Sequence, residues 1–274
     1  MRVTLLFNRD LHANVALNLL APSLGAHDVS IYVSDGPARP TSSQPAFAPM
    51  LAAERTLPLT VLWPLADAVA DDGTSYGSFE RCAARLGAAC ATLNDPNGPA
   101  GLQVLRDARP DVIVSVRYGR ILRDEAIAIP RLGVLNLHSG QLPAYRGVVA
   151  TFRALLCGDS AIGCTLHRVI DAGIDTGPII GIATLDAVRP AVLFDAIKSV
   201  YPPGCAMITD ALAALARGET LPATPPASKG SYFTWPTEGE VSDFLALGHQ
   251  LVELTSYAAL LARYVPGRLA PRSS

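Results

Sequence analysis

The stretch GVLNLHSGQLPAYRG, residues 133–147, decides the fold of this chain. Its first part is a short apolar run, and its second part contains Pro143 and Gly147, which favour a turn. A second apolar run, DVIVSV, precedes it at residues 111–116. Runs that are apolar at consecutive positions are typical of strands buried on both faces of a parallel sheet. The stretch therefore predicts a buried parallel strand followed by a loop at its carboxyl end.

Strand-like and helical patterns alternate over the first 190 residues. This alternation is typical of an α/β protein in which helices cover both faces of the sheet. We therefore predict a doubly wound, mostly parallel, Rossmann-like sheet. The further strands are expected at residues 3–7, 28–34, 163–170 and 178–185, and the helices at residues 12–25, 78–88, 100–110 and 148–158.

The pattern changes after residue 190 and becomes mainly helical. A linker rich in Pro and Ser, LPATPPASKG, follows at residues 221–230, and Thr237 stands three residues before Glu240, as in a capping box. We predict two domains, residues 1–189 and a small helical C-terminal extension, residues 190–274. The apolar stripe at residues 241–264 could pack on its own core or on a second subunit, so a homodimer is possible.

Composition excludes several classes of partner. Half of the 274 residues are hydrophobic and 17% are charged, which is enough for a real core. The net charge of -2 argues against general binding to nucleic acid or to an anionic membrane. The five cysteines are scattered without metal-ligand spacing, so no metal site is predicted. With neither a signal peptide nor a membrane span in the sequence, we expect a cytoplasmic protein with a small-molecule partner.

Two polar side chains mark the end of the strand at residues 133–138. Asn136 and His138 are two residues apart, so both point to the same side, where parallel sheets bind ligands. An imidazole can move a proton near neutral pH, and an amide can donate to an oxygen that gains negative charge. Asp175, in GIDTGPII, is the best candidate for a carboxylate that orients the imidazole, and Asp171 is its rival. Each residue alone is more often structural, and the combination carries the prediction.

Three segments together resemble a known family. They are VRYGRIL, residues 116–122; the run through residues 129–147; and GCTLHRVIDAGIDTGPII, residues 163–180. They closely resemble the folate-dependent formyltransferases, whose members include glycinamide ribonucleotide, methionyl-tRNA and sugar-nucleotide formyltransferases. Asn136, His138 and Asp175 match the family's Asn-x-His and following Asp. The resemblance implies a Rossmann-like formyltransferase fold, with residues 1–189 as the catalytic domain and residues 190–274 on the acceptor side or in oligomerisation.

The resemblance also implies a donor and roles for the three residues. The donor is expected to be 10-formyltetrahydrofolate, with its pterin against Arg120, Ile121 and Leu122, largely through backbone groups, and against the loop that contains Ile170 and Asp171. A neutral amine attacks the formyl carbon, and the Asn136 amide donates to the oxygen as it becomes anionic. His138 stabilises that oxygen or takes the amine proton. Asp175 favours a charged or well-oriented His138 and helps to relay the proton to the folate nitrogen.

Four further residues are candidates for contact with the acceptor. The segment FNRDLHAN, residues 7–14, has no glycine where relatives that bind ribonucleotides carry a phosphate loop. Asn8 and Arg9 contact the acceptor, or belong to a solvated loop and helix cap. Tyr145 stacks on the acceptor or packs in the loop, and Arg146 faces an anionic acceptor or anchors the loop. The interval from Thr165 to Asp175 is one residue longer than usual for the family, which predicts a small bulge.

The sequence thus predicts an N-formyltransferase that moves a formyl group from 10-formyltetrahydrofolate to the amine of a small molecule. The acceptor is an amino sugar nucleotide or an amino acid such as a hydroxyornithine. Residues 190–274 are not basic, which argues against tRNA. The alternatives are a 10-formyltetrahydrofolate hydrolase and a non-catalytic folate-binding relative.

Overall fold

The central feature of the fold is one mostly parallel sheet. The structure, a computed structural model, describes residues 1–36 and 45–266. Within this part, seven strands lie in the order β3-β2-β1-β4-β5-β7-β8. The first five in that order are parallel, and β7 and β8 are antiparallel to their neighbours. This confirms the predicted sheet. The strands are β1 (Arg2–Asn8), β2 (Asp28–Ser34), β3 (Cys90–Thr92), β4 (Val112–Val116), β5 (Val134–His138), β7 (Ala161–Val169) and β8 (Ile179–Asp186).

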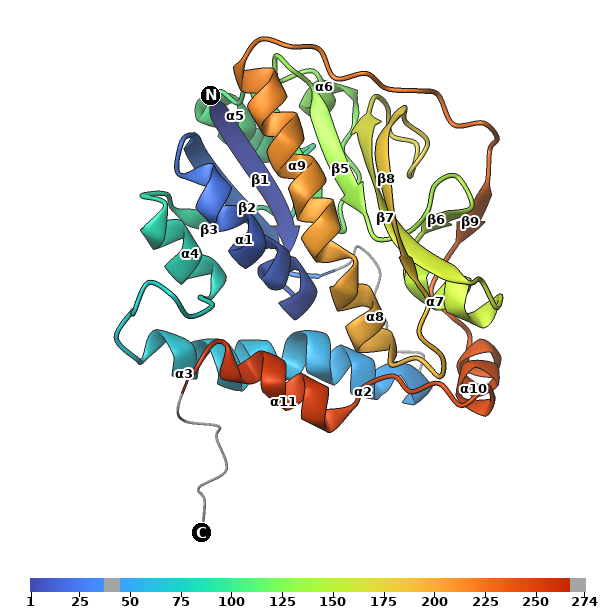
Figure 1. Ribbon diagram of the computed structural model, residues 1–274. Helices are drawn as coiled ribbons and strands as arrows, with labels where there is room; N and C mark the ends of the chain where they lie inside the picture. Colours follow the sequence, from blue (N-terminus) through green and yellow to red (C-terminus); the bar gives the residue numbers. More distant parts are fainter. Residues whose placement is uncertain (37–44, 267–274) are drawn as a thin grey trace.

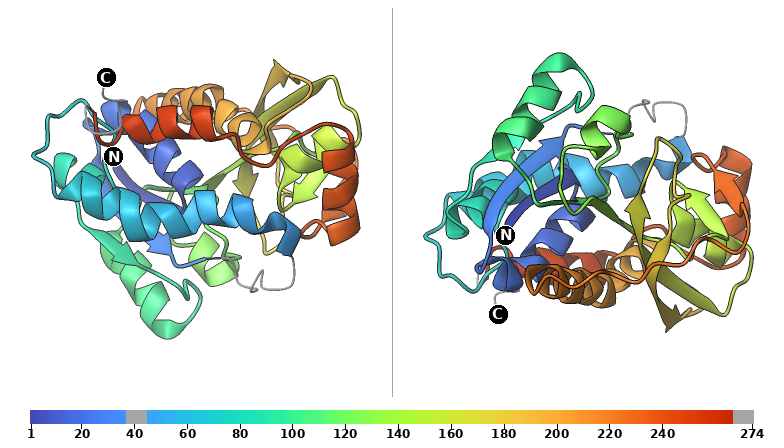
Figure 2. Two further views of the ribbon diagram at one scale, coloured as in Figure 1. Left: turned by 90° about the horizontal axis from the view of Figure 1, so that it is seen from below. Right: turned by 90° about the horizontal axis from the view of Figure 1, so that it is seen from above.

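Helices cover both faces of this sheet (Figure 1). On one face, α1 (Leu11–Leu24) and α9 (Tyr201–Ala216) pack in the same hydrophobic cluster as alternate residues of the central strands. On the other face lie α5 (Pro99–Ala108) and α6 (Asp124–Ile127). They pack against the remaining residues of the same strands, whose side chains point the opposite way. Figure 2 shows the sheet between these two layers. Consecutive apolar residues thus have partners on both sides, as the sequence predicted. The remaining helices near the sheet are α4 (Phe79–Arg85), α7 (Ala150–Leu156) and α8 (Leu193–Ser199).

The strand order places a switch point between β1 and β4. The chain moves outward from β1 to β2 and β3, and then returns to the other side of β1 to form β4 and β5. At such a point the loops after neighbouring strands diverge and leave room for a ligand at the carboxyl edge of the sheet. The residues that follow β1, β4 and β5 therefore share one edge, and His138 is the last residue of β5.

A helical segment at residues 45–67 runs beside the sheet. It consists of short turns that follow one another almost without a break, two of them with π-helical hydrogen bonding. The hydroxyl of Tyr257 in α11 (Leu254–Ala262) donates to the carbonyl oxygen of Ala53, so the two helical segments lie side by side (Figure 1). Residues 37–58 are rich in Pro and Ala and show no clear periodic pattern in the sequence, and of these 37–44 lie outside the described residues. The turns are η1 (Pro45–Phe47), α2 (Ala48–Leu51), η2 (Ala52–Thr56), η3 (Pro58–Leu62) and α3 (Trp63–Asp67).

The C-terminal part is mainly helical, as predicted. The capping box of Thr237 and Glu240 begins α10 (Glu238–Ala246). Residues of α8 and α9 share one hydrophobic cluster with the central strands, and the division at residue 190 stays a prediction. One element was not predicted: β6 (Tyr145–Gly147) pairs in parallel with β9 (Ser231–Phe233) as a second, two-stranded sheet. Three-residue strands that are far apart in the sequence leave no periodic pattern to recognise.

Candidate active site

Asn136 and His138 lie where the sequence placed them, on one side of the end of β5. In the antiparallel pairing with β7, Asn136 is opposite His167 and His138 is opposite Thr165. Nδ2 of Asn136 lies 3.0 Å from Nε2 of His167. Nε2 of His138 lies 2.6 Å from the carbonyl oxygen of Tyr145. Both side chains are therefore held by neighbouring strands or loops rather than free in solvent.

Asp175 closes the group from the loop after β7. Its backbone is left-handed, with φ 55°, which turns the side chain back toward β5. One carboxylate oxygen, Oδ2, lies 3.4 Å from Nδ1 of His138 and accepts a 2.8 Å hydrogen bond from the amide of Gly147. The other, Oδ1, lies 3.5 Å from Nε2 of His167. The structure thus brings together the three residues on which the sequence analysis depended.

Two groups that accept hydrogen bonds face the ring of His138. Its Nε2 faces a carbonyl oxygen and its Nδ1 faces the Asp175 carboxylate, and both partners can only accept hydrogen bonds. A neutral imidazole has one N–H group, whereas the protonated ring has two. Only the protonated ring satisfies both acceptors at once. The geometry is therefore suited to a ring that gains a proton during a reaction.

Asp175 is ionised at neutral pH although it is only 8% exposed. Burial alone would raise the pKa of its carboxyl group. The charge interaction with His138, the contact with His167 and the hydrogen bond from the amide of Gly147 act in the opposite direction and lower the pKa to about 2. The site therefore contains a fixed negative charge beside two imidazoles.

His167 is a site residue that the sequence analysis did not identify. It lies inside β7, and the strand pattern does not distinguish it from its neighbours. Its Nδ1 lies 3.0 Å from the carbonyl oxygen of Arg168, which fixes the ring so that Nε2 faces Asn136 and Asp175. The signal that could have found it is the register of β5 against β7, which a single sequence does not specify.

Asp171 and Asp175 are clearly separated by the structure. Asp171 is exposed, and its Oδ1 accepts a 2.7 Å hydrogen bond from the amide of Gly173 in its own turn. The ion contact to His138 belongs to Asp175. The longer loop predicted a small bulge, and the pairing of β7 with β8 shifts register between Leu166 and His167.

One of the residues expected to face the donor, Leu122, packs on the same face of the sheet as the candidate site. Leu122 is buried in the same cluster as Val134, and Val169 packs against that cluster. Alternation along β5 directs Asn136 and His138 to the same face as Val134. Next to these buried residues, Ile121 and Ile170 are 50% and 58% exposed. Arg120 is half-buried, and its Nη2 lies 3.4 Å from Oδ1 of Asn94.

The residues that follow β1 make a helix cap and ion pairs. Nδ2 of Asn8 donates to Asp10, and Oδ1 of Asp10 accepts from the amide of Ala13 in the first turn of α1. The guanidinium of Arg9 lies 2.6 Å from the carboxylate of Glu80. These contacts agree with the alternative of a loop and helix cap, and contact of Asn8 and Arg9 with an acceptor stays a prediction.

Tyr145 and Arg146 hold the loop after β5. The Tyr145 hydroxyl donates to Oδ2 of Asp159 over 2.7 Å, and its ring is buried. Arg146 donates from Nε to the carbonyl oxygen of Ile174 over 2.9 Å and from Nη1 to that of Lys229 over 2.8 Å. These bonds fit the loop-anchor role that the sequence analysis weighed for Arg146, and they hold the residue just before Asp175.

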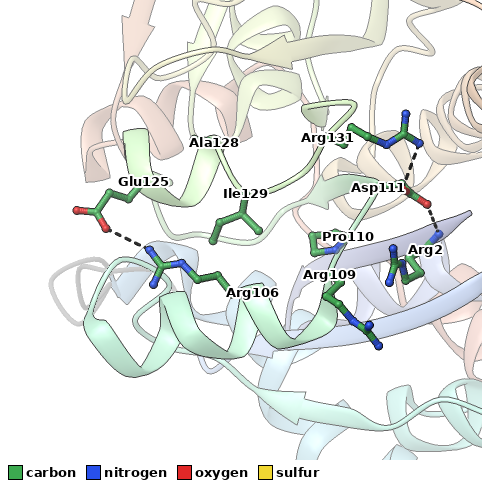
Figure 3. Close-up of a pocket in the computed structure, with 9 residues that line it drawn as sticks. All are labelled: Arg2, Arg106, Arg109, Pro110, Asp111, Glu125, Ala128, Ile129 and Arg131. Carbon is green, nitrogen blue, oxygen red and sulfur yellow. Dashed lines mark hydrogen bonds and ion pairs between the residues drawn. The ribbon is translucent and has the colours of Figure 1, made fainter.

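A cavity of about 680 Å³ lies elsewhere, at the opposite edge of the sheet (Figure 3). It is close to the start of β1 and β4, whereas the candidate site is at the end of β5. The cavity is lined by Arg2, Arg106, Arg109, Pro110, Asp111, Glu125, Ala128, Ile129 and Arg131.

Within the described ranges, no group of three His, Cys, Asp or Glu side chains could hold a metal ion, and no helix is long and apolar enough to cross a membrane.

The sequence of this chain is similar to those of known formyltransferases. Residues 89–190 match the sequence model described as formyl transferase. The methionyl-tRNA formyltransferase of Burkholderia cenocepacia is 39% identical over 133 residues, 47% of this chain and 39% of the relative. That of Roseiflexus sp. is 36% identical over 143 residues, 52% of this chain and 44% of the relative. The chain thus spans less than half the length of these relatives.

Solved structures extend the likeness to most of the fold. An N-formyltransferase from Helicobacter canadensis, in complex with folinic acid and dTDP-3-aminofucose, has a TM-score of 0.57 at 16% identity and covers 90% of this chain and 80% of its own. Glycinamide ribonucleotide transformylase 1 from Symbiobacterium toebii has a TM-score of 0.55 at 18% identity, over 82% of this chain and 92% of its own. Residues 89–190 thus match the formyl transferase model, and the fold of the chain is the one found in solved formyltransferases.

Proposed function

We propose that this protein is an N-formyltransferase that moves a formyl group from 10-formyltetrahydrofolate to the amine of a small molecule. The observation that carries the proposal is the convergence of Asn136, His138 and Asp175 at the carboxyl edge of the sheet, with His138 and Asp175 in ionic contact. An amide donor, an imidazole and a fixed carboxylate are the groups that acyl transfer to an amine requires.

The face beside these residues suits a folate donor. Ile121 and Ile170 are exposed apolar side chains, each next to a residue that packs in the hydrophobic cluster on this face. Ligand pockets commonly combine apolar walls with a few convergent polar groups. The flat pterin would lie between such walls, and its formyl group would extend toward Asn136. These exposed apolar side chains support 10-formyltetrahydrofolate as the donor, which the resemblance implies.

The three side chains have different roles in the transfer. A bond forms between the acceptor nitrogen and the formyl carbon, the bond from that carbon to the folate nitrogen breaks, and the amine proton passes to the folate nitrogen. Asn136 has two N–H groups, one of which faces His167, so the other can donate to the formyl oxygen as it becomes anionic. One such donor stabilises the transition state by about 3 kcal/mol. His138 takes or shares the moving proton, and Asp175 stabilises the charged ring.

A small acceptor is favoured over tRNA. The relatives matched in sequence are methionyl-tRNA formyltransferases, but the match covers about half of this chain. Residues 190–274 carry about as many acidic as basic side chains. A surface that binds RNA needs a clear excess of Lys and Arg to neutralise phosphates. The two-stranded sheet beside Asp175 also brings residues 231–233 close to the site, which suits a compact acceptor.

The test is a turnover assay with purified protein, 10-formyltetrahydrofolate and a panel of amino sugars, amino acids and methionyl-tRNA. We expect release of tetrahydrofolate that depends on a small amine, together with a formylated product. Asn136→Ala and His138→Ala should lose this turnover, whereas Arg217→Ala, which breaks an exposed ion pair with Glu219, should keep it. Equal folate release with and without amine would indicate a hydrolase. Donor binding without turnover would indicate a non-catalytic relative.

A further inference from the structure

We propose that Tyr232 forms an aromatic platform on the acceptor side of the site and selects amines that are carried on a sugar ring. The inference rests on the proposed function and makes its acceptor class more specific. Tyr232 is the central residue of β9, which lies in the C-terminal part of the chain. Its ring is 51% exposed, and within residues 1–36 and 45–266 its hydroxyl makes no hydrogen bond that the structure records.

The register of the small sheet directs Tyr232 toward the site. In the pairing of β6 with β9, Arg146 is opposite Tyr232. Residues opposite one another share a face of the sheet, so these two side chains project to the same side. Arg146 donates to the carbonyl oxygen of Ile174, the residue directly before Asp175. The face that carries Tyr232 is therefore the face that contacts the loop of Asp175.

Gly147 lies against the ring of Tyr232 and also binds the carboxylate of Asp175. A Cβ atom placed on Gly147 would lie 3.0 Å from Cε2 of Tyr232, so the ring rests against this glycine. The amide of the same glycine donates to Oδ2 of Asp175 over 2.8 Å. One peptide unit therefore contacts the ring and binds the carboxylate. An acceptor whose amine approaches the site beside Asp175 would meet the open face of Tyr232.

The exposed ring favours one kind of acceptor. An aromatic face offers a flat apolar surface, which fits the C–H face of a sugar ring. A flexible, charged amino acid has no flat apolar face to place there. The other side of the small sheet is already used in packing, since the rings of Tyr145 and Phe233 lie 5.9 Å apart there. We therefore assign acceptor contact to Tyr232 and packing to Phe233.

The experiment compares two acceptor probes on four proteins. The probes are dTDP-3-aminofucose, the compound named with one structural neighbour, and N5-hydroxyornithine. The proteins are the wild type, Tyr232→Ala, Tyr232→Phe and Leu254→Ala, which truncates an exposed side chain on α11. For each we would measure the acceptor KM and kcat, the donor KM, the thermal midpoint, and calorimetric binding of dTDP-3-aminofucose without donor.

Wild-type protein should use and bind the amino sugar in preference to the amino acid. Tyr232→Ala should raise the acceptor KM and the dissociation constant about five- to tenfold, with kcat, donor KM and thermal midpoint unchanged. Tyr232→Phe and Leu254→Ala should stay within about twofold of wild type.

Equal amino-sugar binding by wild type and Tyr232→Ala, or a preference for hydroxyornithine, would overturn the inference while formyl transfer stands. Failure of the wild type to bind the amino sugar would also overturn it. Binding that depends on Tyr232, without any formyl transfer, would support the platform and refute the proposed function.

Discussion

Asp175 keeps its charge inside the protein because three groups face its two carboxylate oxygens. Those groups are the imidazoles of His138 and His167 and the amide of Gly147. Sequence analysis identified the first partner, since His138 and Asp175 both belong to the family pattern. The other two depend on how β7 and the loop after β5 fold against each other, and so only the structure shows them.

The lowered pKa of Asp175 predicts an acid-labile contribution to stability. The pKa falls from 3.8 to about 2 on folding, so the stabilisation is complete above about pH 4 and is lost as the pH falls toward 2. Its size is about 2 kcal/mol. We expect Asp175→Asn to show a shallower loss of unfolding free energy than wild type over this window, measured by urea unfolding. Asp243→Asn, on an exposed face of α10, should keep the wild-type slope. Parallel curves for wild type and Asp175→Asn would contradict the assignment.

His167 is expected to act by positioning Asn136. Its Nε2 faces the Asn136 amide at 3.0 Å, so removing the ring frees that amide to rotate. We expect His167→Ala to lower kcat about 10- to 100-fold, because a donor displaced by 1 Å loses much of its effect. Acceptor KM should stay close to wild type. A variant that raises acceptor KM while kcat is unchanged would show that His167 contacts the acceptor instead.

At the scale of elements, the small sheet of β6 and β9 connects the C-terminal part to the site. Gly147 has a φ of 96°, and a Cβ there would lie 2.1 Å from the carbonyl oxygen of Phe233. The same residue donates to Asp175. Only glycine fits both the backbone conformation and the close approach of β9.

Gly147→Ala should therefore separate β6 from β9 and move the amide away from Asp175. We expect a loss of more than about 2 kcal/mol in unfolding free energy and a strong fall in turnover. Gly158→Ala is the matched control, since Gly158 also has a positive φ, 83°, but has nothing within 4 Å of its Cβ position. It should cost about 1 kcal/mol and leave turnover intact. Equal effects of the two substitutions would show that strain at the backbone, rather than contact with β9, decides the outcome.

Long, patterned elements were predictable, and short or paired ones were not. The apolar runs of β4 and β5 predicted the parallel sheet, because a strand buried on both faces is apolar at consecutive positions. Asn136, His138 and Asp175 were found because they form a spaced motif. His167 was missed as a neighbour of the site, since its position depends on the register of β7 against β5.

At the scale of the whole molecule, a buried charged network joins the sheet to the helical segment at residues 45–67. Arg117 follows β4 with a left-handed backbone, and its guanidinium contacts Asp10 and Glu54 at 3.0 Å each. Nδ1 of His12, in α1, lies 2.6 Å from the same Glu54 oxygen. Burial would raise the pKa of Glu54, but Arg117 and His12 lower it to about 2. Each charged group in this network is therefore stabilised by the charges of its partners.

Glu54 is the member whose removal tests this role, because it lies on the helical segment while its partners belong to α1 and to the end of β4. Glu54→Ala leaves a half-buried guanidinium with one carboxylate and leaves the buried His12 without its partner at Nδ1. We expect a loss of about 3–5 kcal/mol in unfolding free energy, the cost of breaking a buried ion pair from one side. Glu219→Ala, which breaks the exposed pair with Arg217, should cost less than about 1 kcal/mol. Urea unfolding of both variants at neutral pH measures the difference. Similarly small losses in the two would mean that the helical segment is held by its apolar contacts and not by this network.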